Sequence, residues 1–319
     1  MSIESEITRI NNNIAATYTA LIAKGATMPE TENSANLAST VATVPSGGDP
    51  VNKAFDVVDG ILSMPKNIVF TEDTFAGVTS IGSYGLYFKY YSSGYTTNNP
   101  GGVINFDSVT SIGAYGLQNA FTSCNITSVS FNSLAQLNNS YSLSYSFKNN
   151  KNLTSISFPS LTSVTGSYAI YYCFEKCSSL TSVYFPELET ATESSCLSSL
   201  FSECTALTTA SFPKLKTLGY SSCYNMFKGC TSLESVDFSA LTSIESSGLY
   251  YTFSGCTALT SISFPSLTTV SSGSLNSCFS GCTSLTEIHF RTDMQATVEA
   301  LSGYSSKFGA TNATIYFDL

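Results

Sequence analysis

The residues that most often carry catalysis are scarce in this sequence. The chain has one histidine, His289, and alternation along residues 287–290 points it away from the apolar Ile288 and Phe290. A Ser–His–Asp set needs a histidine between its nucleophile and its carboxylate. In neighbouring copies of the same segment, the position of His289 holds Ser263, Ser211 and Tyr184. We therefore interpret His289 as a surface variant and not as a catalytic base.

A pair of carboxylates, Glu234 and Asp237, is the other candidate for catalysis. Glycoside hydrolysis needs two carboxyl groups across a cleft, one of them with a raised pKa. These two residues would both be exposed on one strand of a flat surface of serine and threonine. No glycine-rich loop of the phosphate-binding kind precedes a helical pattern either. The sequence therefore predicts no enzyme, no catalytic residue, no cofactor and no metal site.

The ten cysteines occupy repeated positions. Six of them follow a phenylalanine by three residues, namely Cys124, Cys177, Cys204, Cys230, Cys256 and Cys282. A free cysteine is a small residue that is readily buried, and no CxxC pair suggests zinc. Coils stacked about 4.8 Å apart would leave a disulfide between neighbours possible by distance. Because no export signal is recognisable, we predict reduced thiols.

Tyrosine is the residue type whose placement favours binding. The chain has 19 tyrosines and no tryptophan, and many lie in two positions between apolar residues, where we expect the rings to face outward. Tyrosine offers a large contact area at low entropic cost, serine adapts its hydrogen bonds, and tyrosine rings can stack on sugars. The alternative is a tyrosine ladder that only covers the outer layer. The candidate binding residues are Tyr145, Tyr171, Tyr172, Tyr224, Tyr250 and Tyr251, with Tyr184 on the alternative strand surface beside Asp237 and His289.

The overall charge narrows the choice of partner. Only 11% of the residues are charged and the formal net charge is −9. Nucleic acids require a patch of lysine and arginine, so we expect no nucleic-acid partner and no adhesion to an anionic membrane. No apolar stretch reaches the length of about 18 residues that a spanning helix needs.

An internal repeat of 26–27 residues must position these side chains. Its unit reads as LTSISFPSLTSV, then a variable Ser/Tyr/Gly segment, then FxxC. The phenylalanine of the first half recurs at gaps of 25, 27, 27, 27, 26, 26 and 26 residues, at Phe106, Phe131, Phe158, Phe185, Phe212, Phe238, Phe264 and Phe290. We expect Phe70 to mark a less regular first coil and Phe317 the last coil, which gives about ten copies.

Each repeat combines a strand with a helical pattern. In residues 259–264, Ile262 and Phe264 share one face of a short strand, and Pro265 ends it. Later in the repeat, Leu249, Phe253 and Cys256 are spaced i, i+4, i+7, which predicts a short helix or helical turn. No copy can cover its own apolar face, so copies must stack. The predicted fold is an α/β repeat solenoid with a parallel β-sheet and short helical turns, preceded by an N-terminal helical segment.

Three regions follow from these patterns: a helical N-terminal module at 1–48, the solenoid at 49–290 and a C-terminal cap at 291–319. In the cap, Met294, Val298 and Leu301 have helical spacing. In the N-terminal module, heptad positions predict a seam that favours a homo-oligomer, most consistent with a trimer. The alternative is a helix that packs on its own chain. The seam residues are Ile3, Ile7, Ile10, Ile14, Thr17 and Leu21.

Two resemblances add to these expectations. The segments FSGCTSLTEI at 279–288 and FSGCTALTSI at 253–262 resemble the BspA-type leucine-rich repeat family, closely over about 100–290 and more loosely over 60–319. The present repeats are somewhat longer than is usual in that family. The segment IAATYTALIAKGATMP at 14–29 resembles, over a shorter stretch, a module at the start of tail-associated proteins of phages and prophages of Gram-positive gut bacteria.

These resemblances imply a leucine-rich-repeat solenoid and a role in binding. We expect a phage tail protein, located in the virion and made in the bacterial cytoplasm without a signal peptide. Its N-terminus would bind other tail or baseplate proteins, and its solenoid a glycan or protein on the host cell. The alternatives are a bacterial surface adhesin, which would need an export route, a purely structural tail or baseplate component, and a cell-wall hydrolase.

The heptad seam can be tested directly. Ile10→Lys would place a charge in the centre of the seam, so we expect it to convert an oligomer of the full chain into monomers, measured by light scattering after size exclusion. Thr17→Lys, towards the end of the seam, should have a smaller effect. An unchanged mass for both variants would exclude the seam.

Overall fold

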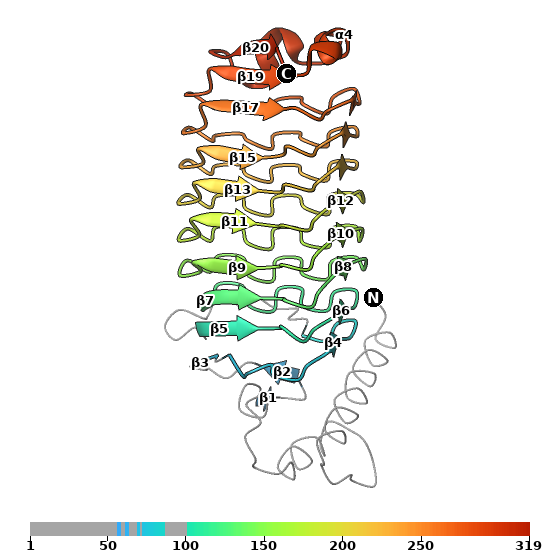
Figure 1. Cartoon of the computed structure of the whole chain (residues 1–319). Helices are drawn as coiled ribbons and strands as arrows, with labels where there is room; N and C mark the ends of the chain where they lie inside the picture. The colour runs from blue at the N-terminus through green and yellow to red at the C-terminus, as the bar shows by residue number, and fades with distance from the viewer. Residues whose placement is uncertain (1–55, 59–60, 64–68, 71, 87–100) are drawn as a thin grey trace.

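The structure is a computed structural model, and it describes residues 56–58, 61–63, 69–70, 72–86 and 101–319. The predicted N-terminal seam and module therefore lie outside the described residues. The described chain forms a solenoid in which each coil, called a rung below, lies on the previous one (Figure 1). Near its start, β1 (Asp56–Val58) and β2 (Ile61–Ser63) form an antiparallel pair. Within the described part, no helix has the length and apolar character that crossing a bilayer requires.

One side of the solenoid is a column of parallel strands. They pair in the orders β3-β5-β7-β9, β11-β13-β15 and β17-β19-β20. Alternate residues point inward, so Val183 of β11 is buried while Tyr184 is exposed. The strands are β3 (Val69–Phe70), β5 (Gly101–Asn105), β7 (Asn125–Ser130), β9 (Ser155–Ser157), β11 (Ser182–Tyr184), β13 (Thr209–Ser211), β15 (Ser235–Asp237), β17 (Ser261–Phe264), β19 (Glu287–Phe290) and β20 (Thr314–Phe317).

A second column of two-residue strands forms the next side of each rung. The second residue of each strand is apolar, and it is buried in all of them except β18. Thr242, which precedes β16, continues the column by accepting hydrogen bonds from the next rung. The strands are β4 (Ser80–Ile81), β6 (Ser111–Ile112), β8 (Gln136–Leu137), β10 (Ser163–Val164), β12 (Thr190–Ala191), β14 (Thr217–Leu218), β16 (Ser243–Ile244) and β18 (Thr269–Val270).

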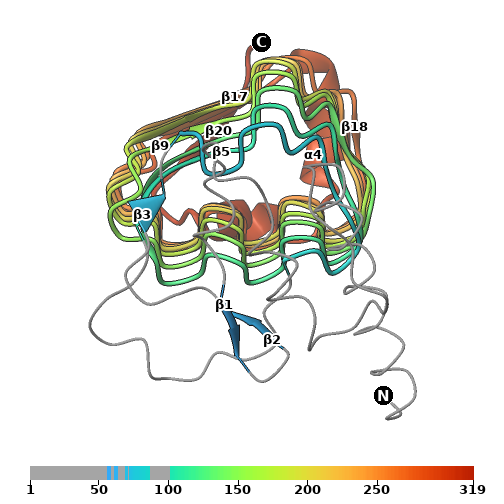
Figure 2. The same cartoon turned by 90° about the horizontal axis from the view of Figure 1, so that it is seen from below.

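The third side, called the turn face below, lies across the solenoid from the long strands (Figure 2). Of the predicted short helix or helical turn, the described rungs contain turns, arranged as successive reverse turns in place of a helix. Alternate N–H groups donate to the next rung, as Tyr145 does to Tyr171 and Phe147 to Cys173, while Ser146 donates three residues back to Leu143. Every fourth residue has a positive φ, in one rung Tyr141, Tyr145 and Asn149. An α-helix would bond four residues back and leave no donor for the next rung.

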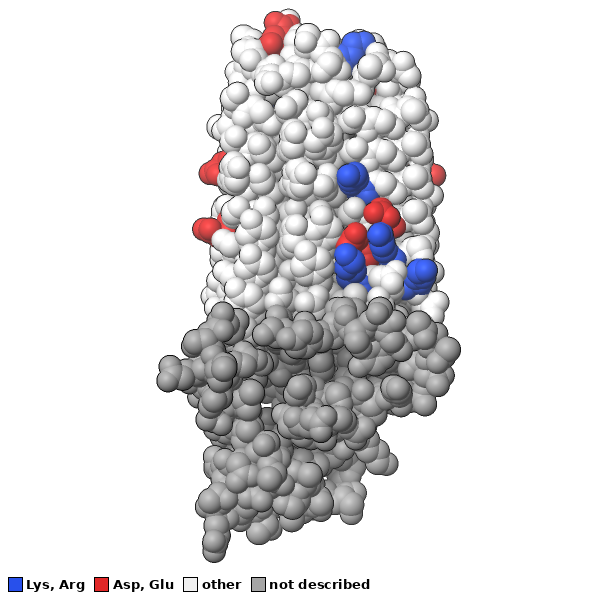
Figure 3. All heavy atoms as spheres, turned by 180° about the vertical axis from the view of Figure 1, so that it is seen from behind, with Lys and Arg blue, Asp and Glu red and all other residues white. Residues whose placement is uncertain are grey.

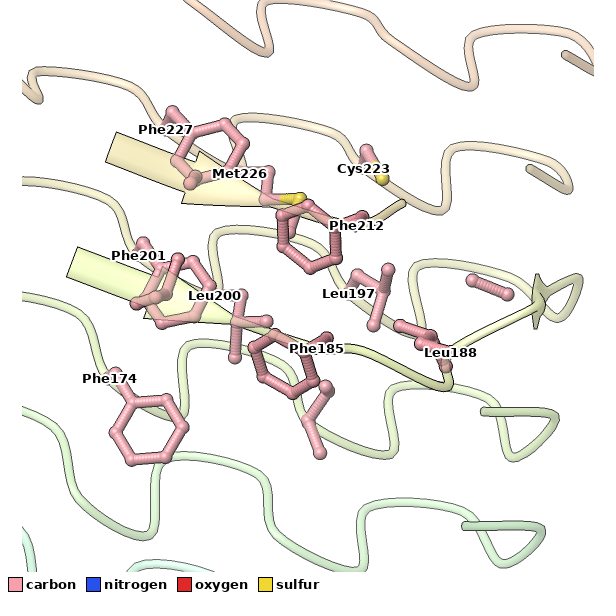
Figure 4. Packing of buried hydrophobic residues seen from close by; sticks show 14 of the residues in the cluster. Phe174, Phe185, Leu188, Leu197, Leu200, Phe201, Phe212, Cys223, Met226 and Phe227 are labelled. Carbon is pink, nitrogen blue, oxygen red and sulfur yellow. The ribbon is translucent and has the colours of Figure 1, made fainter. Parts of the chain in front are cut away.

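Two files of phenylalanine rings fill the interior (Figure 4). In the file beside the strands, the Phe158 ring lies 5.5 Å from that of Phe185, and Phe185 lies 5.2 Å from Phe212. In the file beneath the turn face, Phe174, Phe201 and Phe227 stack at 5.8 Å. The two files meet edge to face, as Phe212 and Phe227 do at 6.3 Å. The expected alignment of the repeated phenylalanines is therefore confirmed.

The first coil differs from the expectation. Phe70 pairs with Gly102 of β5, four residues before Phe106, so it does not occupy the Phe106 position. Phe75 occupies that place instead: it is buried, and its ring centroid lies 4.4 Å from that of Phe106. The irregular spacing before residue 101 concealed this shift in the sequence.

The C-terminal end is closed by a short helical segment and a last strand. It consists of η1 (Thr292–Met294), α4 (Gln295–Glu299), η2 (Tyr304–Gly309) and β20. Met294, Val298 and Leu301 are buried as their spacing indicated. In β20, Phe317 pairs with Phe290, so the expected position of the last rung is confirmed.

Truncating a phenylalanine in the file beneath the turn face should lower the free energy of unfolding more than any surface substitution. We expect Phe201→Ala to lower the free energy of unfolding by about 3–5 kcal/mol, because its cavity removes ring contacts to both neighbouring rungs. Tyr184→Ala is the matched control, since this ring is 59% exposed and its loss should change stability by about 0.5 kcal/mol or less. Urea denaturation measures both, and equal costs would contradict the stacked core.

Candidate functional site

Four tyrosines form a continuous ladder on the turn face. The rings stack at 4.9, 5.0 and 5.1 Å with planes within 9° of parallel. Each has a positive φ of 57–59°, so each occupies the same turn position in its rung. In later rungs this position holds serine or glycine, and the ladder ends. Its members are Tyr84, Tyr115, Tyr141 and Tyr168.

A second tyrosine cluster lies beside this ladder. Tyr145 and Tyr172 stack at 5.2 Å with planes 3° apart. Tyr171 meets both rings edge-on, at 5.4 Å from Tyr145 and 4.3 Å from Tyr172, and contacts Tyr168 of the ladder at 5.3 Å. Burial, and hydrogen bonding to Tyr172, raise the pKa of Tyr171. Its phenol is therefore neutral at physiological pH and can both donate and accept hydrogen bonds.

The structure divides the predicted binding tyrosines into three places. Tyr145, Tyr171 and Tyr172 are together in the cluster just described. Tyr224 stacks on Tyr250 at 5.5 Å, and Tyr250 meets Tyr251 at 4.4 Å, in rungs nearer the C-terminus. Tyr184 belongs to β11 on the strand side. Apart from Tyr184, these rings are half-buried against one another and not fully outward.

A small group of charges lies next to the second tyrosine cluster. The Lys148 ammonium is 2.6 Å from Glu175, whose side chain is only 8% exposed, and 5.3 Å from the ring centroids of both Tyr145 and Tyr172. Lys176 lies 3.6 Å from Glu203 and 3.9 Å from Glu175. In the view of the turn face, lysines and carboxylates gather in one patch and most of the surface above them is uncharged (Figure 3).

An open depression of about 500 Å³ lies where the second tyrosine cluster meets these charged residues. It contains two ammonium groups, two amides, hydroxyl groups and an aromatic ring, and no carboxylate. That combination suits a polar, hydroxyl-rich ligand. Its lining residues are Asn119, Thr122, Ser123, Tyr145, Lys148, Asn149 and Lys176.

The repeats that carry these side chains match a known family model. Six copies of the BspA type leucine rich repeat region match the chain, over residues 103–226 and 198–306, which together cover more than half of it. The chain belongs to this family. Leucine-rich repeats are typically interaction domains and not enzymes, so the solenoid suggests a protein-interaction or adhesive role.

Solved structures with leucine-rich repeats are similar to the BspA-type chain at low identity. A leucine-rich repeat protein from Eubacterium ventriosum is 20% identical over 74% of this chain, with a TM-score of 0.37. The match spans about half, 51%, of that protein's own chain. One from Bacteroides ovatus is 18% identical over 79% of this chain and 78% of its own, with a TM-score of 0.29. The pneumococcal vaccine antigen PcpA is 12% identical over 74% and 70%, with a TM-score of 0.25. No curated protein matches the chain.

The cysteines of the BspA-type repeats are structural. All ten are free and buried. In successive rungs the thiol donates to the phenylalanine carbonyl of the previous rung, for example Cys204 to Phe174 at 3.1 Å and Cys230 to Phe201 at 3.1 Å. Asn150 stands in the same position and donates to Phe121 at 2.7 Å. The position therefore requires a small buried donor, which a disulfide would remove.

His289 and Asp237, which were considered for catalysis, lie at the surface. The imidazole of His289 stacks on Tyr316 at 4.9 Å, with Nδ1 2.9 Å from Asp318. Burial alone would raise the pKa of Asp237, but hydrogen bonds from Ser239 and Ser211 lower it overall. A carboxyl with a lowered pKa is not a general acid for glycoside cleavage. Among the described residues, no group of three or more His, Cys, Asp or Glu side chains is arranged to hold a metal ion.

The tyrosine ladder and the depression were not predicted from the sequence. The signal was available, since Tyr115, Tyr141 and Tyr168 each precede the second phenylalanine of their repeat by six residues. The tyrosines predicted to bind on this face occupy only the positions two and three residues before it.

Burial should protect the thiols. It raises the pKa of Cys124, Cys196 and Cys282 from 9.0 to about 12, so the reactive thiolate is absent at pH 8. We expect almost no reaction of the native chain with Ellman's reagent at pH 8, and reaction of ten thiols in guanidinium without reductant.

The same shift predicts a pH dependence of stability. The folded state favours the neutral thiols, so their contribution to stability is complete below pH 9 and declines as the pH rises above it.

In the labelling experiment, rapid reaction of several thiols in the native chain would contradict their protection by burial, and fewer than ten thiols reacting after unfolding would indicate disulfides.

Proposed function

We propose that this chain is a tail-associated protein of a bacteriophage whose solenoid binds a glycan or protein on the host cell surface. The observation that carries the binding role is the gathering of tyrosines on one face: the ladder Tyr84 to Tyr168 and the cluster of Tyr145, Tyr171 and Tyr172. Tyrosine-rich surfaces provide rigid contact area and phenol groups at low entropic cost. The location in the virion is supported by the resemblance of residues 14–29 to the phage module.

The stacking also limits how these tyrosines bind. Within a ladder each ring covers the face of its neighbour, so the ladder presents ring edges and hydroxyl groups about 5 Å apart. Sugar rings prefer an uncovered aromatic face, whereas edges and hydroxyls serve hydrogen bonding. Inside the ladder, binding would therefore be mainly polar.

Two further functions remain candidates on specific observations. A bacterial surface adhesin is supported by membership of the BspA-type family, and it differs by requiring an export route. A purely structural tail component is supported by the packing of the tyrosines on one another, because rings that only cover the turn face need no ligand. Immunogold labelling of purified particles and fractionation of producing cells separate the first candidate from a virion location.

The binding role is tested by adsorption. Fluorescently labelled full chain should bind cells of the susceptible Gram-positive host, and Tyr171→Ala should reduce the bound amount about tenfold, as loss of a central interface tyrosine does. Tyr250→Ala tests the separate group of Tyr224, Tyr250 and Tyr251 in the later rungs. Thermal unfolding of each variant shows whether the fold is kept.

Tyr184→Ala is the matched control, because this tyrosine lies on the strand side. If Tyr184→Ala alone abolishes adsorption, the binding surface is the strand side. If none of the three substitutions changes adsorption, the tyrosines are structural and the binding proposal is wrong.

A further inference from the structure

One tyrosine of the second cluster stands at the end of its stack, beside the depression. Tyr145 lies against Tyr172 on one side. In the rung before it, the same turn position holds Asn119, not another ring. Asn119 and Tyr145 both line the depression, whereas Tyr172 does not. The depression therefore lies on the side of Tyr145 that faces away from its stacking partner, and the ring offers a face there.

The same depression contains cations without lining carboxylates. Lys148 is held by Glu175, which lies almost completely buried behind it. The contacts of Lys176, at 3.6 and 3.9 Å, are longer than hydrogen bonds, and its side chain is 44% exposed. Lys176 can therefore turn to an incoming anion at small cost. Although the chain carries a net charge of −9, the lining of this depression has two lysines and no carboxylate, because Glu175 and Glu203, which lie near these lysines, are outside the lining.

The neighbouring amide is already oriented. Asn149 donates through its side-chain N–H to the Ser123 hydroxyl at 2.9 Å, which leaves its carbonyl oxygen to accept from a ligand hydroxyl. A sugar ring presents one apolar face and a rim of hydroxyls, so an aromatic face bordered by amides matches it. The two ammonium groups add a requirement for negative charge.

We propose that this depression is a subsite for an acidic saccharide unit. The apolar face of the sugar packs on Tyr145, its hydroxyls bond to Asn119 and Asn149, and its carboxylate or phosphate pairs with Lys176 and Lys148. The subsite would supply charge selectivity to the host-binding role proposed above, and it rests on that role. The shared chemistry, an anion on a sugar or polyol, has two sources, a uronate or a phosphodiester.

The experiment titrates the full chain with three probes by calorimetry at low and physiological salt. The probes are an oligosaccharide that alternates glucuronate with N-acetylglucosamine, its carboxyl-reduced neutral form, and poly(glycerol phosphate). We expect one of the two anionic probes to bind, which identifies the source, and the neutral form to bind at least about tenfold more weakly. Binding should weaken as salt rises, because exposed charges are screened.

Variants locate the site. Lys176→Gln and Tyr145→Ala should each weaken the anionic probe about tenfold, while Tyr145→Phe keeps most of the binding because the ring face remains. Lys216→Gln and Tyr220→Ala are matched controls: Lys216 pairs with Glu189 on another side of the solenoid, and Tyr220 is an exposed tyrosine of a later rung that does not line the depression. Neither control should change binding.

The outcomes separate the subsite from the wider function. Equal binding of neutral and anionic probes, binding of none of the three probes, or equal effects of test and control variants would overturn the subsite. If host cells still adsorb the chain in that case, the proposed host-binding role survives. If the chain adsorbs to no host cell, that role fails and the subsite loses its purpose with it.

Discussion

The stacking of phenylalanine on phenylalanine in successive rungs is the constraint on which the rest of this solenoid depends. Except for the last ring, Phe317, the rings of both files are buried, and stacked neighbours have centroids about 5–6 Å apart. A rung that lost its register would expose two large rings and leave its hydrogen bonds to both neighbours unmade. Each fully buried ring contributes about 1.5–3 kcal/mol, so no rung is stable alone and each is stabilised by its neighbours.

The same repetition determines the surface. Because each surface position recurs about 5 Å away in the next rung, whatever residue occupies it forms a column. Tyrosines then become a ladder, as Tyr115, Tyr141 and Tyr168 do. Like charges in one column would repel each other, and the described columns place opposite charges in succession: Glu187 pairs with Lys214, and Glu189 with Lys216. Such exposed pairs add little stability, but they avoid the repulsion that like charges in one column would cause.

Much of the fold could be predicted because the residues that repeat with the period of the rungs are the buried ones. Phe158, Phe185 and Phe212 repeat at one spacing, and only stacking can bury all of them. On the turn face a helix and successive turns could not be distinguished, since the spacing i, i+4, i+7 of Leu249, Phe253 and Cys256 fits both. What decides between them is the bonding of alternate N–H groups to the next rung, a contact between distant residues that leaves no local pattern.

The candidate site was only partly predictable for a related reason. The tyrosines were recognisable as an unusual set, but which rings cover one another depends on the turn positions that they occupy. Tyr145 has Asn119 before it and Tyr172 after it, so another ring stacks on only one of its faces. The pairing of Lys148 with Glu175 joins residues 27 positions apart, and the sequence could not distinguish that pair from any other pair of surface charges.

Deletion of one whole rung tests the central claim most directly. Leu180 and Leu207 are 27 residues apart and occupy equivalent positions, so removing residues 180–206 should let Phe174 pack beneath the next ring of its file. The prediction is a folded chain with an unchanged circular dichroism spectrum per residue and one cooperative unfolding transition, while removing residues 180–193, half a rung, should unfold it. If both deletions unfold the chain, or if both leave it folded, the rungs are not held together by register of their stacked phenylalanines.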